Sequence, residues 1–193
     1  MRLFAALELS AEARAGISEA FARLRSLAPK ARWVSAESMH LTLHFFGEIP
    51  DDLVDRFSPV FDDPSLQVPA MPVRFGPAGF FPGSGTPKVL WMGIAAGVEP
   101  MRAFWSQLTG KLEALRTGTG PLQTWTPDAR GFSPHITVAR AGTVPLSRQW
   151  AVEVKPPAEE FTVRRCVLFQ SLLGAGGARY VPQKTIQFRG DDK

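Results

Sequence analysis

Segment 40–47, His-Leu-Thr-Leu-His-Phe-Phe-Gly, alternates between polar and apolar residues. An apolar residue at every second position is typical of a strand that buries one of its faces. The apolar face of this predicted strand carries Leu41, Leu43 and Phe45. Its polar face carries His40, Thr42 and His44. This polar face is unusual, because it presents imidazole and hydroxyl groups where exposed strand faces usually carry charges.

The same pattern returns in segment 133–140, Ser-Pro-His-Ile-Thr-Val-Ala-Arg, about half a chain further on. His135 and Thr137 share one face there, and apolar residues occupy the other. Two of the three histidines thus open a His-x-Thr-apolar tetrad, at residues 40–43 and 135–138. A repeat at this separation is expected of an internal duplication, in which each half contributes one tetrad.

The remaining pattern predicts a mixture of strands and helices. Helical spacing of apolar residues predicts helices over residues 11–27, 51–61, 99–116 and 147–152. Extended segments are predicted over residues 1–9, 32–34, 67–75, 89–95, 161–171 and 179–188. The last two would form a hairpin with its turn at residues 174–177. Loops are predicted over residues 76–88 and 117–132. This order predicts the α+β class, with mostly antiparallel strands and helices on the outer faces.

Composition narrows the class of protein. Of the 193 residues, 45% are hydrophobic and 21% are charged, as in ordinary globular proteins. The net charge of +4 is a mild basic excess, which permits a polyanionic partner such as RNA without requiring one. The single cysteine, Cys166, cannot form an internal disulfide and is predicted to be an inert core residue. No apolar run has the length of a membrane span or forms a secretory signal, so we expect a cytoplasmic protein.

The two tetrads suggest acid–base chemistry on a phosphate. Histidine has the side-chain pKa nearest neutrality, so a pair can supply one neutral base and one protonated acid at the same pH. Cleavage of a phosphodiester without a metal requires such a pair. Thr42 and Thr137 would direct hydroxyl donors at the phosphate oxygens, where negative charge grows in the transition state. We therefore predict that His40 and His135 meet around one phosphate.

Four stretches carry a resemblance to a known family: residues 32–34, 40–47, 133–140 and 170–180. In this order they resemble the 2H phosphoesterases, and within them the RNA 2′,3′-cyclic phosphodiesterases, also called 2′-5′ RNA ligase-like proteins. The resemblance implies one bilobal domain over residues 1–193, with two mostly antiparallel sheets that face a central cleft. It also implies a pseudo-two-fold arrangement, with one tetrad from each lobe.

The resemblance further implies the reaction, which is hydrolysis of an RNA 2′,3′-cyclic phosphate end to a 2′-phosphomonoester. His40 would be the proton donor and His135 the proton acceptor, although pseudo-symmetric histidines can exchange these roles. Members of this family need neither a metal nor another cofactor, and some also join RNA ends through 2′-5′ bonds without ATP. The expected partner is RNA with a cyclic phosphate end or a related nucleotide. We expect no membrane association and a monomer.

Further residues are candidates for substrate binding. His44 shares the predicted polar face of His40. Phe46 can stack on a base, as can Trp33 and Trp125, although such aromatics more often lie in the core. Arg140 resembles a family position that contacts the phosphate or nucleotide. Strict alternation directs Arg140 away from His135, so that role requires a bulge or a strand end that re-aims it.

Three other functions remain open at this stage. A metal-dependent hydrolase could use His40, His44 and His135, but no acidic ligand lies near them in sequence. An RNA-binding module without catalysis would tolerate alanine at His135. The same fold could also act on another cyclic phosphate or on a 2′-5′ linked oligonucleotide, and loops 76–88 and 117–132 would then set the choice of substrate.

Overall fold

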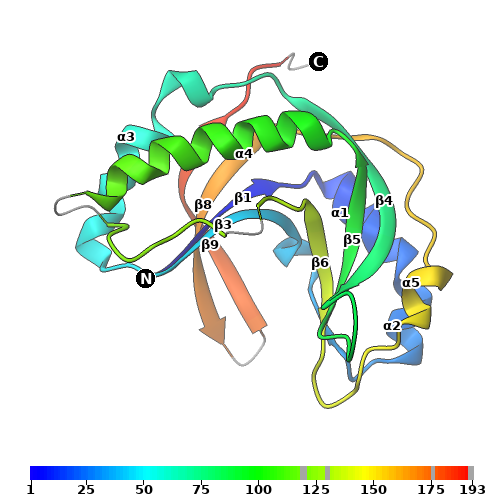
Figure 1. Cartoon of the computed structure of the whole chain (residues 1–193). Helices are drawn as coiled ribbons and strands as arrows, with labels where there is room; N and C mark the ends of the chain where they lie inside the picture. Colours follow the sequence, from blue (N-terminus) through cyan, green and yellow to red (C-terminus); the bar gives the residue numbers. More distant parts are fainter. Residues whose placement is uncertain (118–120, 129–130, 175–176, 191–193) are drawn as a thin grey trace.

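The computed structural model describes residues 1–117, 121–128, 131–174 and 177–190 (Figure 1). Within this part of the chain, nine strands form one curled sheet in the order β7-β4-β5-β6-β3-β1-β8-β9, and β2 pairs with β6. The neighbouring strands in this order are antiparallel. The strands are β1 (Arg2–Glu8), β2 (Arg32–Trp33), β3 (His40–Glu48), β4 (Met71–Phe81), β5 (Val89–Ala96), β6 (His135–Arg140), β7 (Phe161–Val163), β8 (Arg165–Gly174) and β9 (Gly177–Gln187).

The sheet consists of two halves with equivalent strand orders. In one half the tetrad strand β6 is followed outward by β5 and β4, and in the other half β3 is followed by β1 and β8. One registered pair, Leu41 with Ile136, joins β3 to β6 in the described structure, and both side chains are fully buried. The α+β class and the antiparallel strands are therefore confirmed. The two expected sheets are continuous with each other at this junction.

Helices pack on both halves of the sheet. The α-helices are α1 (Ala11–Ala20), α2 (Ala22–Leu27), α3 (Ser58–Phe61), α4 (Val98–Glu113) and α5 (Gln149–Glu153). The short 3-10 segments are η1 (Ala36–Ser38), η2 (Asp51–Phe57), η3 (Pro64–Leu66) and η4 (Ala114–Arg116). In Figure 1, α4 lies across the β8–β1–β3 half, whereas α1 and α2 lie on the side of β4 and β5. None of the helices described here has the length and apolar character of a membrane span.

Several predicted boundaries are wrong for identifiable reasons. The predicted helix 11–27 breaks at Phe21, and the predicted helix 51–61 is largely the 3-10 segment η2. The strand predicted over residues 67–75 begins at Met71 and continues to Phe81, through the Gly- and Pro-rich segment that was predicted as a loop. This strand tolerates its glycines because a register irregularity lies between Gly76 and Ala78, and because the Trp91 ring occupies the space above Gly79.

The hairpin predicted near the end of the chain is present. Strands β8 and β9 pair along their length from Arg165 to Gly174, and residues 175–176 of its predicted turn lie outside the described residues. Residues 121–128 of the long predicted loop contain turns and no helix or strand. Residues 118–120 and 129–130 of that loop are likewise outside the described part. Cys166 is fully buried in β8, where burial raises the pKa of its thiol.

Candidate active site

The two tetrad histidines have the same anchor. The Nδ1 atom of His40 lies 2.8 Å from the carbonyl oxygen of Ser38, and that of His135 lies 2.8 Å from the carbonyl oxygen of Ser133. A carbonyl oxygen only accepts hydrogen bonds, so Nδ1–H must be the donor in both rings. This fixes the tautomer and leaves Nε2 of each neutral ring as the atom that can accept a proton from a reacting group.

The junction between the two halves brings the tetrads onto one face. Residues on either side of a paired position point to the opposite face of a sheet. The residues that flank the buried pair Leu41 and Ile136 therefore share one face: His40, Thr42, His135 and Thr137. All four side chains are partly exposed, in contrast to the apolar residues between them. The structure thus places together the four residues for which the sequence predicted catalytic roles.

A bulge follows each His-x-Thr motif. In β3, Thr42 pairs with Ala6 and His44 pairs with Ala5, which leaves Leu43 without a partner in β1. In β6, Thr137 pairs with Trp91 and Ala139 with Leu90, which leaves Val138 as the extra residue. A residue inserted in this way reverses the facing of every position beyond it. The strict alternation assumed in the sequence analysis therefore fails at the same point in both halves.

The bulge at Leu43 removes His44 from the site. His44 is 4% exposed, and its Nε2 lies 3.0 Å from Oγ1 of Thr109 in α4. That hydroxyl donates to the carbonyl oxygen of Trp105, so it accepts from Nε2–H of His44. The Trp105 ring stacks on the imidazole at 5.5 Å. The prediction that His44 contacts substrate is wrong, and His44 cannot share a metal ion with the tetrad histidines on the opposite face.

Phe46 follows His44 into the core. It is 7% exposed and packs against Phe57 and Trp125, so the predicted stacking of Phe46 or Trp125 on a base is also wrong. Trp33 is partly buried, packs against the core and donates its indole N–H to the carbonyl oxygen of Ala28. Phe45, which was predicted on the apolar face, instead lies on the face of His40 and Thr42 and is 63% exposed.

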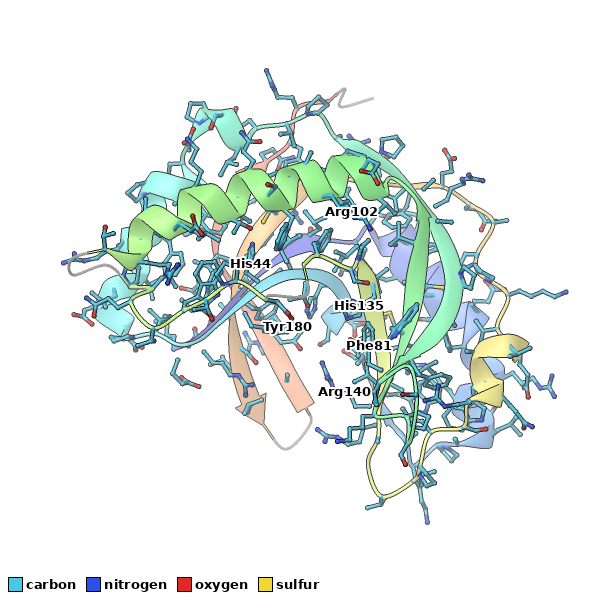
Figure 2. The ribbon with its side chains drawn as sticks, in the orientation of Figure 1. His44, Phe81, Arg102, His135, Arg140 and Tyr180 are labelled. Carbon is cyan, nitrogen blue, oxygen red and sulfur yellow. The ribbon has the colours of Figure 1, made fainter. Side chains whose placement is uncertain are left out.

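The equivalent bulge at Val138 re-aims Arg140. Arg140 is exposed and lies five positions after His135, as Phe45 lies five positions after His40. Its positive charge lowers the pKa of both tetrad histidines, which indicates that its guanidinium lies near both rings. Figure 2 shows Arg140 near His135, Phe81 and Tyr180, whereas His44 lies apart beneath α4. The bulge that the substrate-binding role of Arg140 requires is therefore present.

Aromatic rings enclose each tetrad histidine. Tyr180 meets His40 edge-on at 5.1 Å, and Phe4 lies 4.8 Å from the same ring. Phe81 meets His135 edge-on at 4.8 Å, and Trp91 lies 6.3 Å away. Phe4, Phe81 and Trp91 were not predicted from the sequence as neighbours of the histidines. Phe81 was missed because it lies in the segment that was predicted as a loop.

Burial sets the charge state of the site. Desolvation lowers the pKa of His40 to about 4, with smaller lowering contributions from Arg140 and His135, while the Ser38 carbonyl oxygen acts in the opposite direction. Desolvation also lowers the pKa of His135. Both rings are therefore neutral near pH 7 in the free protein. An anion bound between them would raise both pKa values, because opposite charge favours the protonated form.

The buried His44 gives the protein a measurable pH dependence of stability. Desolvation lowers its pKa to about 4, whereas the unfolded chain has the ordinary value of 6.5. The unfolded state therefore binds a proton first, and stability that is complete above this ordinary value falls as the pH drops toward the lowered one. His44→Gln should make the change in unfolding free energy between about pH 7 and about pH 4.5 smaller by about 2 kcal/mol. Denaturant melts at both pH values test this, and parallel pH curves for the two proteins would contradict it.

The groups near the two histidines favour proton transfer over metal binding. Among the described residues, no three His, Cys, Asp or Glu side chains are grouped so that they could hold a metal ion. The groups gathered on the shared face are two imidazoles, two threonine hydroxyls and one guanidinium. These can transfer protons, donate hydrogen bonds and neutralise negative charge, which suits an anionic phosphate.

Known proteins match the chain over most of its length. The family model of the 2'-5' RNA ligase superfamily matches residues 13–175. The RNA 2',3'-cyclic phosphodiesterase of Thermus thermophilus is 34% identical over 187 residues, covering 84% of this chain and 87% of the relative. The enzyme of the same name from Escherichia coli is 30% identical over 186 residues, covering 95% of this chain and 94% of the relative.

Solved structures agree with these matches. The TT0787 protein of Thermus thermophilus has a TM-score of 0.71 at 30% identity, covering 99% of this chain and all of that chain. Escherichia coli LigT in complex with 3'-AMP has the same fold, with a TM-score of 0.73 at 24% identity and 98% coverage of each chain. The predicted family and the predicted class of enzyme, a phosphodiesterase, are both confirmed. The chain belongs to the 2'-5' RNA ligase superfamily.

Proposed function

We propose that this protein hydrolyses RNA 2′,3′-cyclic phosphate ends to 2′-phosphomonoesters by acid–base catalysis with two histidines. The observation that carries the proposal is the pair of tetrads on one face, each with the same Nδ1 anchor and the same bulge. Relatives named RNA 2',3'-cyclic phosphodiesterase support the substrate class. Structures of LigT with 3'-AMP and with phosphate support a nucleotide phosphate at the site.

The anchors define how the protons move. His135, neutral at Nε2, takes a proton from a water molecule as the water oxygen forms a bond to phosphorus. The bond from phosphorus to the 3′-oxygen breaks, and His40 supplies a proton from its own Nε2 to that oxygen. The phosphate stays on the 2′-oxygen. His40 leaves the cycle neutral and His135 leaves it protonated, so solvent exchange restores the starting state.

The burial of both rings explains how one protein can prepare an acid and a base. In the free protein, desolvation keeps both pKa values low. The negative charge of the phosphodiester raises both values when it binds, so one ring can hold a proton in the complex. We assign the acid role to His40, following the family resemblance. Thr42 and Thr137 donate to the phosphate oxygens, and Arg140 offsets the charge that grows on them.

The same groups serve ligation. If a 5′-hydroxyl of a second RNA replaces water as the nucleophile, the product is a 2′-5′ linkage, and no ATP is needed because the cyclic phosphate carries the required strain. The family model that matches the chain is named for this activity. Ligation and hydrolysis would then differ only in what occupies the His135 side of the phosphate.

The proposal is tested with a short RNA that ends in a 2′,3′-cyclic phosphate, incubated with the protein in excess EDTA. We expect turnover that is insensitive to the chelator and a product that co-migrates with the 2′-phosphate standard, not the 3′-phosphate standard. Loss of activity in EDTA with recovery on adding a divalent metal would contradict the mechanism. Binding of the RNA without turnover would favour the non-catalytic module, and turnover of only small cyclic nucleotides or 2′-5′ linked oligonucleotides would favour those substrates.

A further inference from the structure

A cavity of about 390 Å³ adjoins His40. Its lining comes from α1, the segment around η1, and strands β1, β3, β8 and β9, so all the strands that line it belong to the half of the sheet that contains His40. No residue of β4, β5 or β6 lines it. The cavity therefore extends the site on one side of the phosphate position, next to His40, and leaves the His135 side apart from it.

Two arginines, Arg179 and Arg14, line the cavity. Arg179 is exposed, and no ion pair or hydrogen bond joins its side chain to the described residues. The partly exposed guanidinium of Arg14 pairs with Glu8 at 3.7 Å, and its charge reaches His40, whose pKa it lowers. Glu8, a carboxylate of the lining, is already paired with Arg14 and Arg165. Its charge is thus offset within the protein.

The other walls suit a nucleoside. The rings of Phe169 and Tyr180 and the ring of Pro182 provide apolar surface, and Ser35 and Ser38 provide hydroxyls. Ser38 donates its proton to the carbonyl oxygen of Ala178 and accepts a hydrogen bond from the Ser35 hydroxyl, which leaves one acceptor position on the Ser38 oxygen for a hydroxyl or amino group. Glu37 lines the same cavity and offers a second acceptor. Cations beside an aromatic wall are the usual means of binding single-stranded nucleic acid.

The geometry of the reaction indicates which part of the substrate lies here. In a phosphoryl displacement the attacking and leaving oxygens lie roughly in line on opposite sides of phosphorus. If His40 protonates the leaving 3′-oxygen, the ribose that carries this oxygen lies on the His40 side. The RNA chain continues from the 5′ position of that ribose. The chain must then leave the phosphate on the side where the cavity opens.

We propose that this cavity binds the RNA segment immediately 5′ of the terminal cyclic phosphate, with Arg179 and Arg14 facing its backbone phosphate. The proposal rests on the proposed function and on His40 as the acid. It predicts that the enzyme prefers an oligonucleotide end over a cyclic mononucleotide, because a mononucleotide has no backbone phosphate to place there. It also makes Arg179 a residue that determines specificity for RNA length.

The test compares two substrates with the same terminal nucleotide, 2′,3′-cyclic AMP and a triadenylate ending in 2′,3′-cyclic phosphate. For the native protein we expect kcat/KM to be about tenfold or more higher on the trinucleotide at low salt. Arg179→Ala should cut that ratio about tenfold, mainly through KM on the trinucleotide. The slope of log kcat/KM against log salt should become shallower by about 0.7, the value for one lost contact to a single-strand phosphate. Arg102→Ala, which removes an exposed arginine of α4, is the matched control and should leave the ratio unchanged.

The possible results separate this inference from the proposed function. Equal kcat/KM on the two substrates, or an equal loss on both in Arg179→Ala, would overturn the cavity assignment while cyclic phosphate hydrolysis stands. No turnover of either substrate by the native protein would instead overturn the proposed function. A thermal melt of Arg179→Ala checks that the exposed substitution leaves the fold intact.

Discussion

Replacement of His135 by alanine is expected to lower kcat on a cyclic phosphate end by roughly 10²- to 10⁴-fold, and replacement of His40 by a similar factor. Each imidazole would carry one of the two proton transfers, and no other described titratable side chain on that face is anchored in the same way. KM should change little, because Thr42, Thr137 and Arg140 would still be in place to bind the phosphate. Single-turnover kinetics with a labelled RNA measures the chemical step directly.

His44 provides the control for this experiment. His44→Gln removes the remaining histidine of the chain, but its side chain lies on the opposite face of the sheet under α4. The variant should lose thermal stability and keep the kcat of the folded protein. If the His40 and His135 variants kept the native kcat, the two-histidine mechanism would be untenable. If His44→Gln lost as much activity as they do without unfolding, the assignment of His44 to the core would be wrong.

Replacement of Gly79 by alanine is the second change with a large expected effect. The added Cβ would lie 2.3 Å from Cζ2 of Trp91, which is far closer than two carbon atoms can approach. The Trp91 ring would have to move, and it contacts Phe81 at 5.3 Å and lies beside His135. We expect a loss of about 1–3 kcal/mol in unfolding free energy from overpacking. We also expect kcat to fall roughly 10- to 100-fold, because His135 loses part of its support.

The activity loss in Gly79→Ala has a signature that instability alone would not produce. A displaced Trp91 leaves His135 less buried, so the lowered pKa of this ring should rise toward its ordinary value. The acidic limb of the kcat/KM profile should then move to higher pH. Gly83→Ala in the same hairpin is the matched control, since its added Cβ would meet nothing within 4 Å. If Gly79→Ala and Gly83→Ala had the same kcat and the same pH profile, the position of the Trp91 ring would not affect His135.

The tetrads and the antiparallel α+β class could be predicted from sequence because they depend on short-range alternation. His40 with Thr42 and His135 with Thr137 need only two-residue spacing to share a face. The roles of the residues just beyond could not be predicted in this way. One inserted residue at Leu43 reverses the facing of His44, and nothing in the local sequence marks that insertion.

Gly79 illustrates a different limit. In sequence, glycine and proline between residues 76 and 82 indicate a turn, yet most of this stretch belongs to β4. Gly79 has no side chain, which leaves room for the ring of Trp91 on the next strand. This packing requirement involves residues far apart in sequence. The contact of Phe81 with His135 could not be predicted either, because Phe81 lies in the same stretch. Cavity shape, and hence the placement of Arg179, likewise depends on chain segments far apart in sequence.

The junction between the two halves has a mechanical consequence. A ladder along the whole of β1 holds β1 to β3, but the described β3 and β6 share only the registered pair Leu41 and Ile136. We therefore expect resistance to bending and shear to be lowest at this junction, between the two tetrad imidazoles. Each ring keeps a stiff orientation, because its Nδ1 bond lies within its own half. The distance between the two rings is thus the part of this geometry that changes most easily, and it can change without altering the tautomer of either histidine.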